Sequence, residues 1–214
     1  MDTGTDHDAL PVSAESPLMI NPDGWLQVSS PDSSCPIPVR HVASPNFNPR
    51  PEQASVRLIV LHNISLPPAQ FGGGYIEQFF QNQLDPNAHP YFQTIHELKV
   101  SAHVLILRTG EIIQFVSCHD RAWHAGRSSY LGVPECNDYS VGIELEGTDD
   151  QPFTDEQYAA VIAVILGIQQ AYPHTRQHLA GHADIAPGRK TDPGQHLDWQ
   201  RIRRAIASYY ADAS

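Results

Sequence analysis

The feature that most constrains the fold is an unbroken apolar run, Leu58-Ile59-Val60-Leu61, which ends at His62. A run of β-branched and aliphatic residues without alternation is typical of a strand that is buried on both faces. Such strands occur mainly in sheets that have helices packed on either side. We therefore expect this strand inside a sheet whose two faces are both covered.

A second strand is predicted where apolar residues alternate with Gly142, Glu144 and Glu146. Because side chains in a strand point alternately to opposite faces, both glutamates are expected on one face of the sheet. Residues 103–107 and 111–116 are predicted to form a hairpin across Arg108-Thr109-Gly110. The long polar stretch 117–139 is predicted to be a loop, and loops of that length are often functional.

Helices are predicted in three places. Residues 75–83 carry apolar side chains at helical spacing, and Thr154 with Gln157 forms a capping box before a helix that Pro173 ends. A further helix is predicted behind Asp198 as its N-cap. Hairpin strands together with isolated buried strands indicate the α/β or α+β class, with a central mixed β-sheet flanked by helices.

The N-terminal segment differs in composition from the rest of the chain. Residues 1–39 contain six acidic residues and no Lys or Arg, and residues 1–21 show no helical or strand period. We expect residues 1–21 to be a disordered acidic extension and residues 22–210 to form one domain. The chain carries a formal charge of −11, which disfavours nucleic acid and anionic membranes as partners.

Two further patterns concern the compartment and the thiols. The longest apolar stretch, residues 159–166, is far shorter than the roughly 20 residues that span a bilayer, and the N-terminus lacks the pattern of a secretory signal. The expected compartment is therefore the cytoplasm. Cys35, Cys118 and Cys136 are widely spaced, odd in number and without CxxC spacing, which is typical of reduced thiols without a role.

Three residues could form a catalytic metal site. His62 ends the buried strand, His182 lies in a Gly-His-Ala-Asp segment after the main helix, and Asp192 follows ten residues later. Two histidines and a carboxylate that leave a fourth position open are a pattern of catalytic zinc sites. Each residue also has a common structural role, as a strand-end histidine, a turn cap and a turn initiator before proline. The spacing alone leaves these alternatives open.

Longer segments carry a resemblance to a known family. They are residues 61–68 (LHNISLPP), 85–92 (DPNAHPYF), 121–126 (RAWHAG), 141–149 (VGIELEGTD) and 181–194 (GHADIAPGRKTDPG). In this order, over about residues 22–206, the chain resembles the type-2 N-acetylmuramoyl-L-alanine amidases, and among them the cytosolic branch that acts on 1,6-anhydromuropeptides. The resemblance implies the fold of the peptidoglycan-recognition proteins, in which a mixed sheet is surrounded by helices and zinc lies in a surface groove.

The resemblance also implies roles for individual residues. His62, His182 and Asp192 match the ligands of one Zn²⁺, Glu144 matches the catalytic glutamate and Lys190 the catalytic lysine. The segments that line the groove contribute the substrate-binding candidates Asn63, Tyr91, Trp123 and His124. Glu146 shares the face of Glu144, so the residues themselves do not separate the two. Gly188 departs from the family, where a glutamate is expected, and we expect it to loosen the loop that carries Lys190.

The implied reaction is hydrolysis of the amide between the lactyl group of N-acetylmuramic acid and L-alanine during peptidoglycan recycling. The expected partner is a small anhydromuropeptide, bound by a monomer, with Arg108, Arg121 and Arg127 as candidate cations for its carboxylates. Three alternatives are a non-catalytic peptidoglycan-recognition module, a secreted amidase that acts on the wall polymer, and a structural zinc site. A recognition module has no need of Asp192, Glu144 and Lys190 together, and a structural zinc site needs four ligands.

Overall fold

The computed structural model describes residues 16–29 and 37–212 of the chain. A six-stranded sheet forms its centre, with the strand order β12-β5-β11-β6-β7-β3. Its strands are β3 (Val39–His41), β5 (Leu58–Ile64), β6 (Val104–Ile106), β7 (Ile112–Gln114), β11 (Ser140–Glu146) and β12 (Leu179–Gly181). All neighbouring pairs are parallel except β6 and β7, so the predicted mixed sheet and the predicted hairpin are both confirmed.

Three small antiparallel pairs and seven helices surround this sheet in the described part of the chain. The pairs are β1 (Leu18–Ile20) with β2 (Leu26–Val28), β4 (Phe47–Pro49) with β8 (Asp120–Ala122), and β9 (Ser129–Tyr130) with β10 (Val133–Pro134). The helices are α1 (Tyr75–Phe80), α2 (Phe92–Ile95), α3 (Asp155–Ala171), α4 (His182–Ile185), α5 (Trp199–Asp212) and the 3₁₀ helices η1 (Cys136–Asp138) and η2 (Pro173–Gln177).

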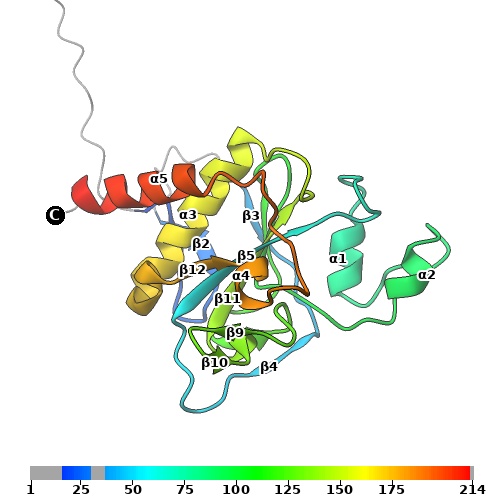
Figure 1. The fold of residues 1–214 in the computed structure, drawn as a ribbon, viewed down its shortest axis with the longest axis horizontal. Coiled ribbons are helices and arrows are strands. Elements are labelled where there is room, and N and C mark those ends of the chain that lie inside the picture. The colour runs from blue at the N-terminus through cyan, green and yellow to red at the C-terminus, as the bar shows by residue number, and fades with distance from the viewer. Residues whose placement is uncertain (1–15, 30–36, 213–214) are drawn as a thin grey trace, which may run out of the picture.

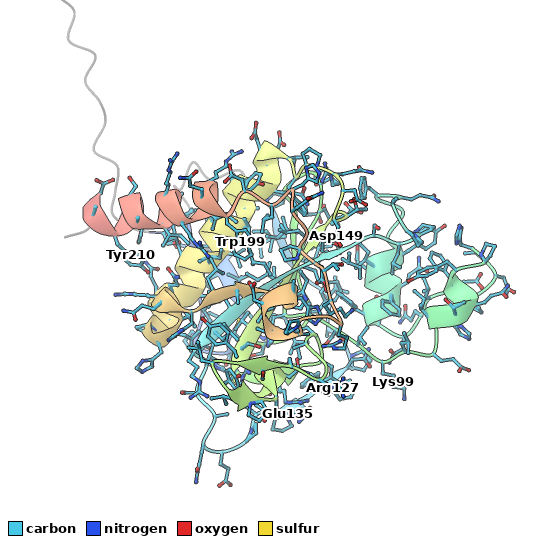
Figure 2. All side chains as sticks on the ribbon, viewed as in Figure 1. Lys99, Arg127, Glu135, Asp149, Trp199 and Tyr210 are labelled. Atoms are coloured by element: carbon cyan, nitrogen blue, oxygen red, sulfur yellow. The ribbon has the colours of Figure 1, made fainter. Side chains whose placement is uncertain are left out.

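One face of the sheet is packed against α3, with α5 outside it (Figure 1). The predicted capping box is present, because Thr154 Oγ1 accepts a hydrogen bond from Gln157 N–H and the Gln157 side chain accepts one from Thr154 N–H. Asp198 accepts a hydrogen bond from Arg201 N–H at the start of α5. Figure 2 shows Trp199 and Tyr210 near the two ends of that helix.

The opposite face of the sheet is covered in two separate places. At the β6–β7 end, Leu105 and Ile113 pack with the phenylalanines of α1 and α2, which lie together at one side of the molecule (Figure 1). At the β5–β12 end, Leu58 and Val60 pack against α4 and the segment between β8 and β11. His62 of β5 and Glu144 of β11 lie on this face, between the two apolar clusters.

The expected boundary of the N-terminal extension is wrong in its last part. Residues 1–15 lie outside the described residues, but Leu18–Ile20 form β1, which pairs with β2 and packs on α3. Leu18 is fully buried in the core, and the absence of a side chain at Gly167 lets α3 approach the backbone of Leu18 closely. A three-residue strand has too short a period to be seen in sequence, and its stability comes from this tertiary packing.

The segment between residues 117 and 139 was predicted to be a loop, but the structure shows regular elements in it. It contains β8, β9, β10 and η1, and it folds back over the sheet near the ends of β5 and β11. Cys118 and Cys136 are free and buried, and Cys35 lies outside the described residues. Within residues 16–29 and 37–212, no helix combines the length and the apolar character needed to span a bilayer.

Candidate active site

The register of β5 and β11 brings His62 and Glu144 together. The two strands are parallel, and Glu144 is the partner of His62 in the ladder, so both side chains lie on the same face of the sheet. His182 comes directly after β12, which pairs with the other side of β5 and ends at Gly181 opposite Leu61. Three neighbouring parallel strands therefore deliver two histidines and a glutamate to one place.

Asp192 joins the two histidines through the loop that follows α4. His62 Nδ1 lies 2.9 Å from His182 Nδ1 and 3.2 Å from Asp192 Oδ2, and His182 Nδ1 lies 3.0 Å from the same oxygen. The loop is tied back by a hydrogen bond from Ala183 N–H to Asp192 O. The predicted convergence of these three residues is thus seen in the structure, and they can hold a metal ion.

The other ring nitrogen of His182 shows which of its atoms carries a lone pair toward the cavity. His182 Nε2 donates to Ala125 O at 3.1 Å, which leaves His182 Nδ1 without a proton in the neutral ring. Burial lowers the pKa of His62 to about 4, so its ring is neutral at pH 7. Asp192 adds a carboxylate, whose Oδ2 lies 3.2 Å from His62 Nδ1 and 3.0 Å from His182 Nδ1.

This donor set fits a tetrahedral divalent ion. Bonds of about 2.0–2.1 Å in tetrahedral geometry place the ligand atoms about 3.3 Å apart, close to the separations of 2.9–3.2 Å in the triangle. Two imidazole lone pairs that face each other at 2.9 Å repel unless a cation lies between them. The three residues supply three ligands and leave the fourth position to the cavity, which is the arrangement of a catalytic site rather than of a closed structural one.

Glu144 and Glu146, which the sequence did not separate, have different surroundings. Glu146 is buried, and its two carboxylate oxygens accept hydrogen bonds from Gly72 N–H at 2.6 Å and Arg108 N–H at 3.1 Å. Glu144 lines the cavity, and its buried Oε2 has no hydrogen-bond partner among the described residues. Burial, reinforced by the charge of Asp192, raises the pKa of Glu144 well above its usual value. Glu146 is therefore a structural anchor, and Glu144 is available for proton transfer.

A cavity of about 550 Å³ lies in front of these groups. One wall is apolar and comes from α1, α2 and the residues that follow them, with Phe79, Phe80, Ile95 and Leu98 as examples. The lining also contains His182, Asp192 and the exposed Lys190. The predicted substrate-binding residues Asn63, Tyr91, Trp123 and His124 all contribute to the lining.

His124 lines the cavity, but both of its ring nitrogens already have protein partners. His124 Nδ1 lies 2.9 Å from His62 Nε2, and His124 Nε2 lies 3.0 Å from Ser140 Oγ. Its ring lies so close to β11 that a Cβ at Gly142 would come within 2.4 Å of His124 Cγ. These contacts indicate that His124 supports His62 from the edge of the cavity.

The three arginines expected to bind substrate carboxylates do not line the cavity. Arg121 donates to Asp138 Oδ1 at 2.5 Å and lies 3.6 Å from Glu135, while Arg108 donates to Pro152 O and stacks on Phe71. Arg127 lies beside the β9–β10 pair, at the surface where Glu135 also lies (Figure 2).

Among the described residues, the cations that line the cavity are Lys99, Arg189 and Lys190. Arg189 lies next to Lys190 in the segment 181–194, which resembles the amidase family. Its position beside the expected catalytic lysine could have identified it from the sequence. Lys99 has no such signal in the sequence.

Gly188 also differs from the expectation. Its φ is +76°, a left-handed conformation that glycine adopts without strain, and a Cβ there would meet no atom within 4 Å. The loop is held by hydrogen bonds from the Arg189 guanidinium to Ala125 O at 2.6 Å and Arg127 O at 2.7 Å. Glycine thus suits the local backbone, and contacts of Arg189 oppose the loosening that we expected.

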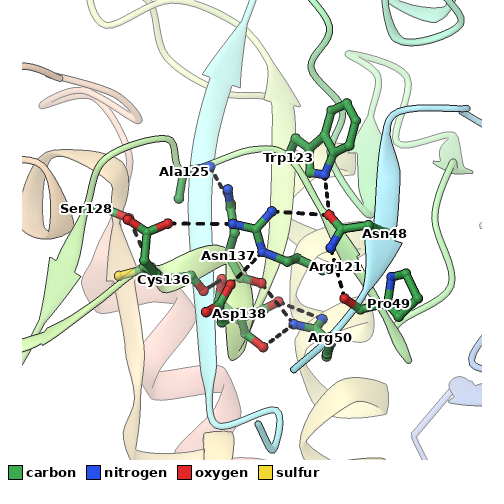
Figure 3. Close-up of polar contacts among 12 residues, drawn as sticks. Asn48, Pro49, Arg50, Arg121, Trp123, Ala125, Ser128, Cys136, Asn137 and Asp138 are labelled. Carbon is green, nitrogen blue, oxygen red and sulfur yellow. Dashed lines mark hydrogen bonds and ion pairs between the residues drawn. The ribbon is translucent and has the colours of Figure 1, made fainter. Parts of the chain in front are cut away.

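The segment that carries His124 and Ala125 is held by one buried amide. Asn137 Oδ1 accepts hydrogen bonds from His124 N–H at 3.2 Å and from Ala125 N–H at 2.8 Å, and Figure 3 shows Asn137 facing Ala125. Beside it, Arg50 donates to the carbonyls of Cys118, Asn137, Asp138 and Ser140. These contacts explain how an irregular segment can present a histidine and a carbonyl at fixed positions behind both metal-ligand candidates.

Comparisons with known proteins agree with this geometry. The family model of N-acetylmuramoyl-L-alanine amidases matches residues 52–195. The 1,6-anhydro-N-acetylmuramyl-L-alanine amidase AmpD of Haemophilus influenzae is 52% identical over 78% of this chain and 91% of its own length, and the AmpD of Escherichia coli K12 is 48% identical over 88% and 98%.

Solved structures show the same similarity. A crystal structure of a selenomethionine derivative of AmpD superposes with a TM-score of 0.80 at 49% identity, and covers 87% of this chain and 99% of that one. AmpDh3 of Pseudomonas aeruginosa in complex with anhydromuramic pentapeptide superposes with a TM-score of 0.52 at 30% identity, covering 70% of this chain and 59% of the other.

Proposed function

This chain belongs to the N-acetylmuramoyl-L-alanine amidase family, and we propose that it is the zinc-dependent member that releases stem peptides from 1,6-anhydromuropeptides in peptidoglycan recycling. The bond cleaved is the amide between the lactyl group of the muramic acid and L-alanine. The observation that carries the proposal is the convergence of His62, His182 and Asp192 in one cavity, beside a Glu144 carboxylate oxygen that has no hydrogen-bond partner among the described residues.

Amide hydrolysis needs a polarised carbonyl, an activated water and a proton for the departing amine. We assign one Zn²⁺ to His62 Nδ1, His182 Nδ1 and Asp192 Oδ2, whose two neutral imidazoles and single carboxylate suit this ion. When bound there, the ion supplies Lewis-acid polarisation and lowers the pKa of a coordinated water to about 7. The remaining tasks fall to residues of the chain.

Glu144 is assigned the proton transfers. Glu144 lines the cavity, and its buried Oε2 has no hydrogen-bond partner among the described residues, so the carboxylate can accept the proton of the attacking water and deliver it to the nitrogen of L-alanine. Burial raises the pKa of Glu144, which favours a carboxyl group that holds the proton between the two transfers. Glu146 cannot take this part, because both of its oxygens are bonded to backbone N–H groups.

Lys190 is assigned the stabilisation of negative charge on the carbonyl oxygen. It lies two residues before Asp192 and lines the same cavity, so its ammonium group can approach a substrate bound beside the carboxylate ligand. A preorganised cation near a developing oxyanion is among the largest contributions to catalysis. Lys190→Ala is therefore expected to lower kcat while the protein keeps its zinc.

The cavity supports a small, charged fragment as the substrate. A volume of about 550 Å³ and an apolar wall with Tyr91 and Trp123 suit a compact sugar, and Lys99 and Arg189 suit the carboxylates of a stem peptide. The AmpD enzymes that share 48–52% identity with this chain are named for the 1,6-anhydro sugar, and AmpDh3 was solved with an anhydromuramic pentapeptide.

The test is a paired digestion with metal analysis. Purified full-length protein is incubated with an anhydro-N-acetylmuramyl tripeptide and, separately, with intact sacculi, and released peptides are quantified by mass spectrometry. We expect one zinc per chain and much faster release from the fragment. Equal rates on sacculi would favour a wall-lytic amidase, and binding without hydrolysis would favour a recognition module.

Two further measurements concern the ligands and the compartment. His182→Ala is expected to lose both zinc and activity, and stoichiometric zinc in that variant would refute the ligand assignment. We propose that the enzyme works in the cytoplasm, which its identity to AmpD enzymes supports. Fractionation of the native protein tests this, and recovery from the periplasm would overturn it.

A further inference from the structure

A chain of hydrogen bonds leads from a backbone carbonyl to His62 through two side chains. Ser140 Oγ lies 2.6 Å from Cys136 O and 3.0 Å from His124 Nε2, and His124 Nδ1 lies 2.9 Å from His62 Nε2. Ser140 is fully buried, and His62 and His124 are buried as well. The directions of these hydrogen bonds are therefore decided by the protein groups themselves.

The carbonyl at the end of the chain sets all of the directions. Cys136 O can only accept, so the hydrogen of Ser140 Oγ points to it; otherwise two oxygens would face each other at 2.6 Å with no hydrogen between them. Ser140 Oγ then accepts from His124, whose proton is on Nε2. In a neutral ring this leaves His124 Nδ1 as an acceptor, so the proton of His62 is on Nε2.

The consequence falls on the atom that faces the cavity. With its proton on Nε2, His62 presents a lone pair at Nδ1 toward His182 Nδ1 and Asp192 Oδ2. The other tautomer would place a hydrogen at Nδ1, in the middle of the metal-ligand triangle, and a metal ion would have to displace it. A ligand histidine is therefore held in its binding tautomer by a hydroxyl that it does not touch.

We propose that Ser140 is a positioning residue of the metal site, which acts through His124 to fix the tautomer of His62. The proposal rests on the zinc site proposed above and adds to it a residue that lies outside the cavity lining. His182 has no need of such a relay, because its Nε2 donates directly to Ala125 O. The two ligand histidines thus reach the same state by different routes.

The strand backbone is shaped to admit this relay. Gly142 lies between Ser140 and Glu144 on the same face of β11, and a Cβ there would come within 2.4–2.7 Å of three His124 ring atoms. The ring therefore fills the space that a side chain at position 142 would occupy. This contact holds His124 in line between Ser140 and His62.

Ser140→Ala removes the acceptor for His124 Nε2 and leaves the rest of the triangle in place. His124 is then free to carry its proton on Nδ1 and donate to His62, which moves the His62 proton to Nδ1. Loss of a hydrogen-bond partner behind a metal ligand typically lowers metal affinity about 10–100-fold. We expect a loss in that range for zinc, measured on the full chain by competition with a chromogenic chelator.

A matched pair of substitutions at His124 tests the same idea without altering Ser140. The side-chain amide of His124→Asn can place an oxygen near the position of Nδ1 and accept from His62 Nε2. The longer side chain of His124→Gln reaches the position of Nε2 instead, next to Ser140, and leaves His62 unsupported. Zinc affinity of the Asn variant is expected within about threefold of the wild type, and that of the Gln variant about 10–100-fold lower.

The direct readout is the ¹⁵N signature of His62 in the metal-free wild type and in Ser140→Ala. We expect the Nε2–H tautomer in the wild type and a mixture in the variant, a difference that a merely structural defect would not produce. Equal zinc affinity of Ser140→Ala and wild type, or of the two His124 variants, would overturn the proposal, as would an Nδ1–H tautomer in the wild type. If the wild type itself bound no zinc, the proposed function would fail as well. Zinc binding by the wild type therefore distinguishes a failure of the proposed function from a failure of the Ser140 proposal alone.

Discussion

Glu144 and Glu146 offer a contrast between two carboxylates that lie two residues apart on one strand face. We predict that Glu144→Gln lowers kcat by about 10²–10⁴, the usual contribution of general acid–base catalysis, or about 2.7–5.5 kcal/mol of activation free energy. The variant is expected to keep its zinc and its stability, because Glu144 Oε2 has no hydrogen bond to lose among the described residues. The amide is nearly isosteric with the carboxylate and cannot accept the proton.

The matched control is Glu146→Gln, for which the expected costs are reversed. Glu146 accepts from Gly72 N–H and Arg108 N–H, and an amide can satisfy one of these buried donors but not both. An unsatisfied buried donor costs about 1–3 kcal/mol of unfolding free energy, while kcat is expected within about twofold of the wild type.

The assay for this pair combines steady-state kinetics on an anhydromuropeptide with urea denaturation of the same zinc-loaded preparations. A loss of kcat in Glu146→Gln without one in Glu144→Gln would exchange the two roles. A large fall in the unfolding free energy of Glu144→Gln would show instead that its carboxylate has a structural partner that the geometry does not reveal. Either result refutes the reasoning from hydrogen-bond partners.

Three further predictions concern packing and pH. Leu18→Ala is expected to lower the unfolding free energy by about 2–5 kcal/mol because Leu18 is fully buried, whereas Met19→Ala on the exposed side of β1 should change it by less than about 0.5 kcal/mol. Urea denaturation of both variants measures these changes, and equal effects would contradict the packing of β1 on α3. Gly142→Ala is expected to displace the His124 ring and lower both stability and zinc affinity, measured by thermal unfolding and chelator competition, and a variant with both properties unchanged would contradict the close contact. In the metal-free protein, the raised pKa of Glu144 means that the folded state binds the Glu144 proton more tightly than the unfolded state does. The stability that this proton contributes is present below the usual pKa of 4.5 and is lost as pH rises through the folded-state pKa. Glu144→Gln should therefore gain unfolding free energy relative to the wild type as pH rises above 4.5, and a gain that falls with pH would contradict this sign.

The sequence predicted best those elements whose pattern is local. The apolar run before His62 predicts a strand and the capping box at Thr154 predicts a helix start, each from a few neighbouring residues. Both predictions are confirmed, as β5 and α3. The convergence of His62, His182 and Asp192 depends on strand order, which no local pattern contains. The residue types indicated it only as one alternative, the family resemblance favoured it, and the structure brings the three residues together.

The predictions that failed depend on contacts distant in sequence. β1 was assigned to a disordered tail because three residues show no period, and only its packing against α3 reveals it. Arg121 was a candidate for substrate binding because it lies in a polar loop, but Asp138, seventeen residues later, neutralises it. Alternation placed Glu144 and Glu146 on one face correctly, yet it says nothing of which loop covers each of them.

The irregular segment from Cys118 to Ser140 shows how a long loop can hold a site in place. Burial lowers the pKa of Arg50 only to about 10, so its guanidinium stays charged at pH 7 and donates to four backbone carbonyls of this segment. A charged donor makes stronger hydrogen bonds than a neutral one, and the planar fork fixes the directions of several at once. The ladders in this segment are short, those of β8 with β4 and of β9 with β10, and the hydrogen bonds of Arg50 add order where they end. That order is what allows Ala125 O and His124 Nδ1 to lie within hydrogen-bond distance of both ligand histidines, so the site depends on Arg50 although Arg50 touches neither of them.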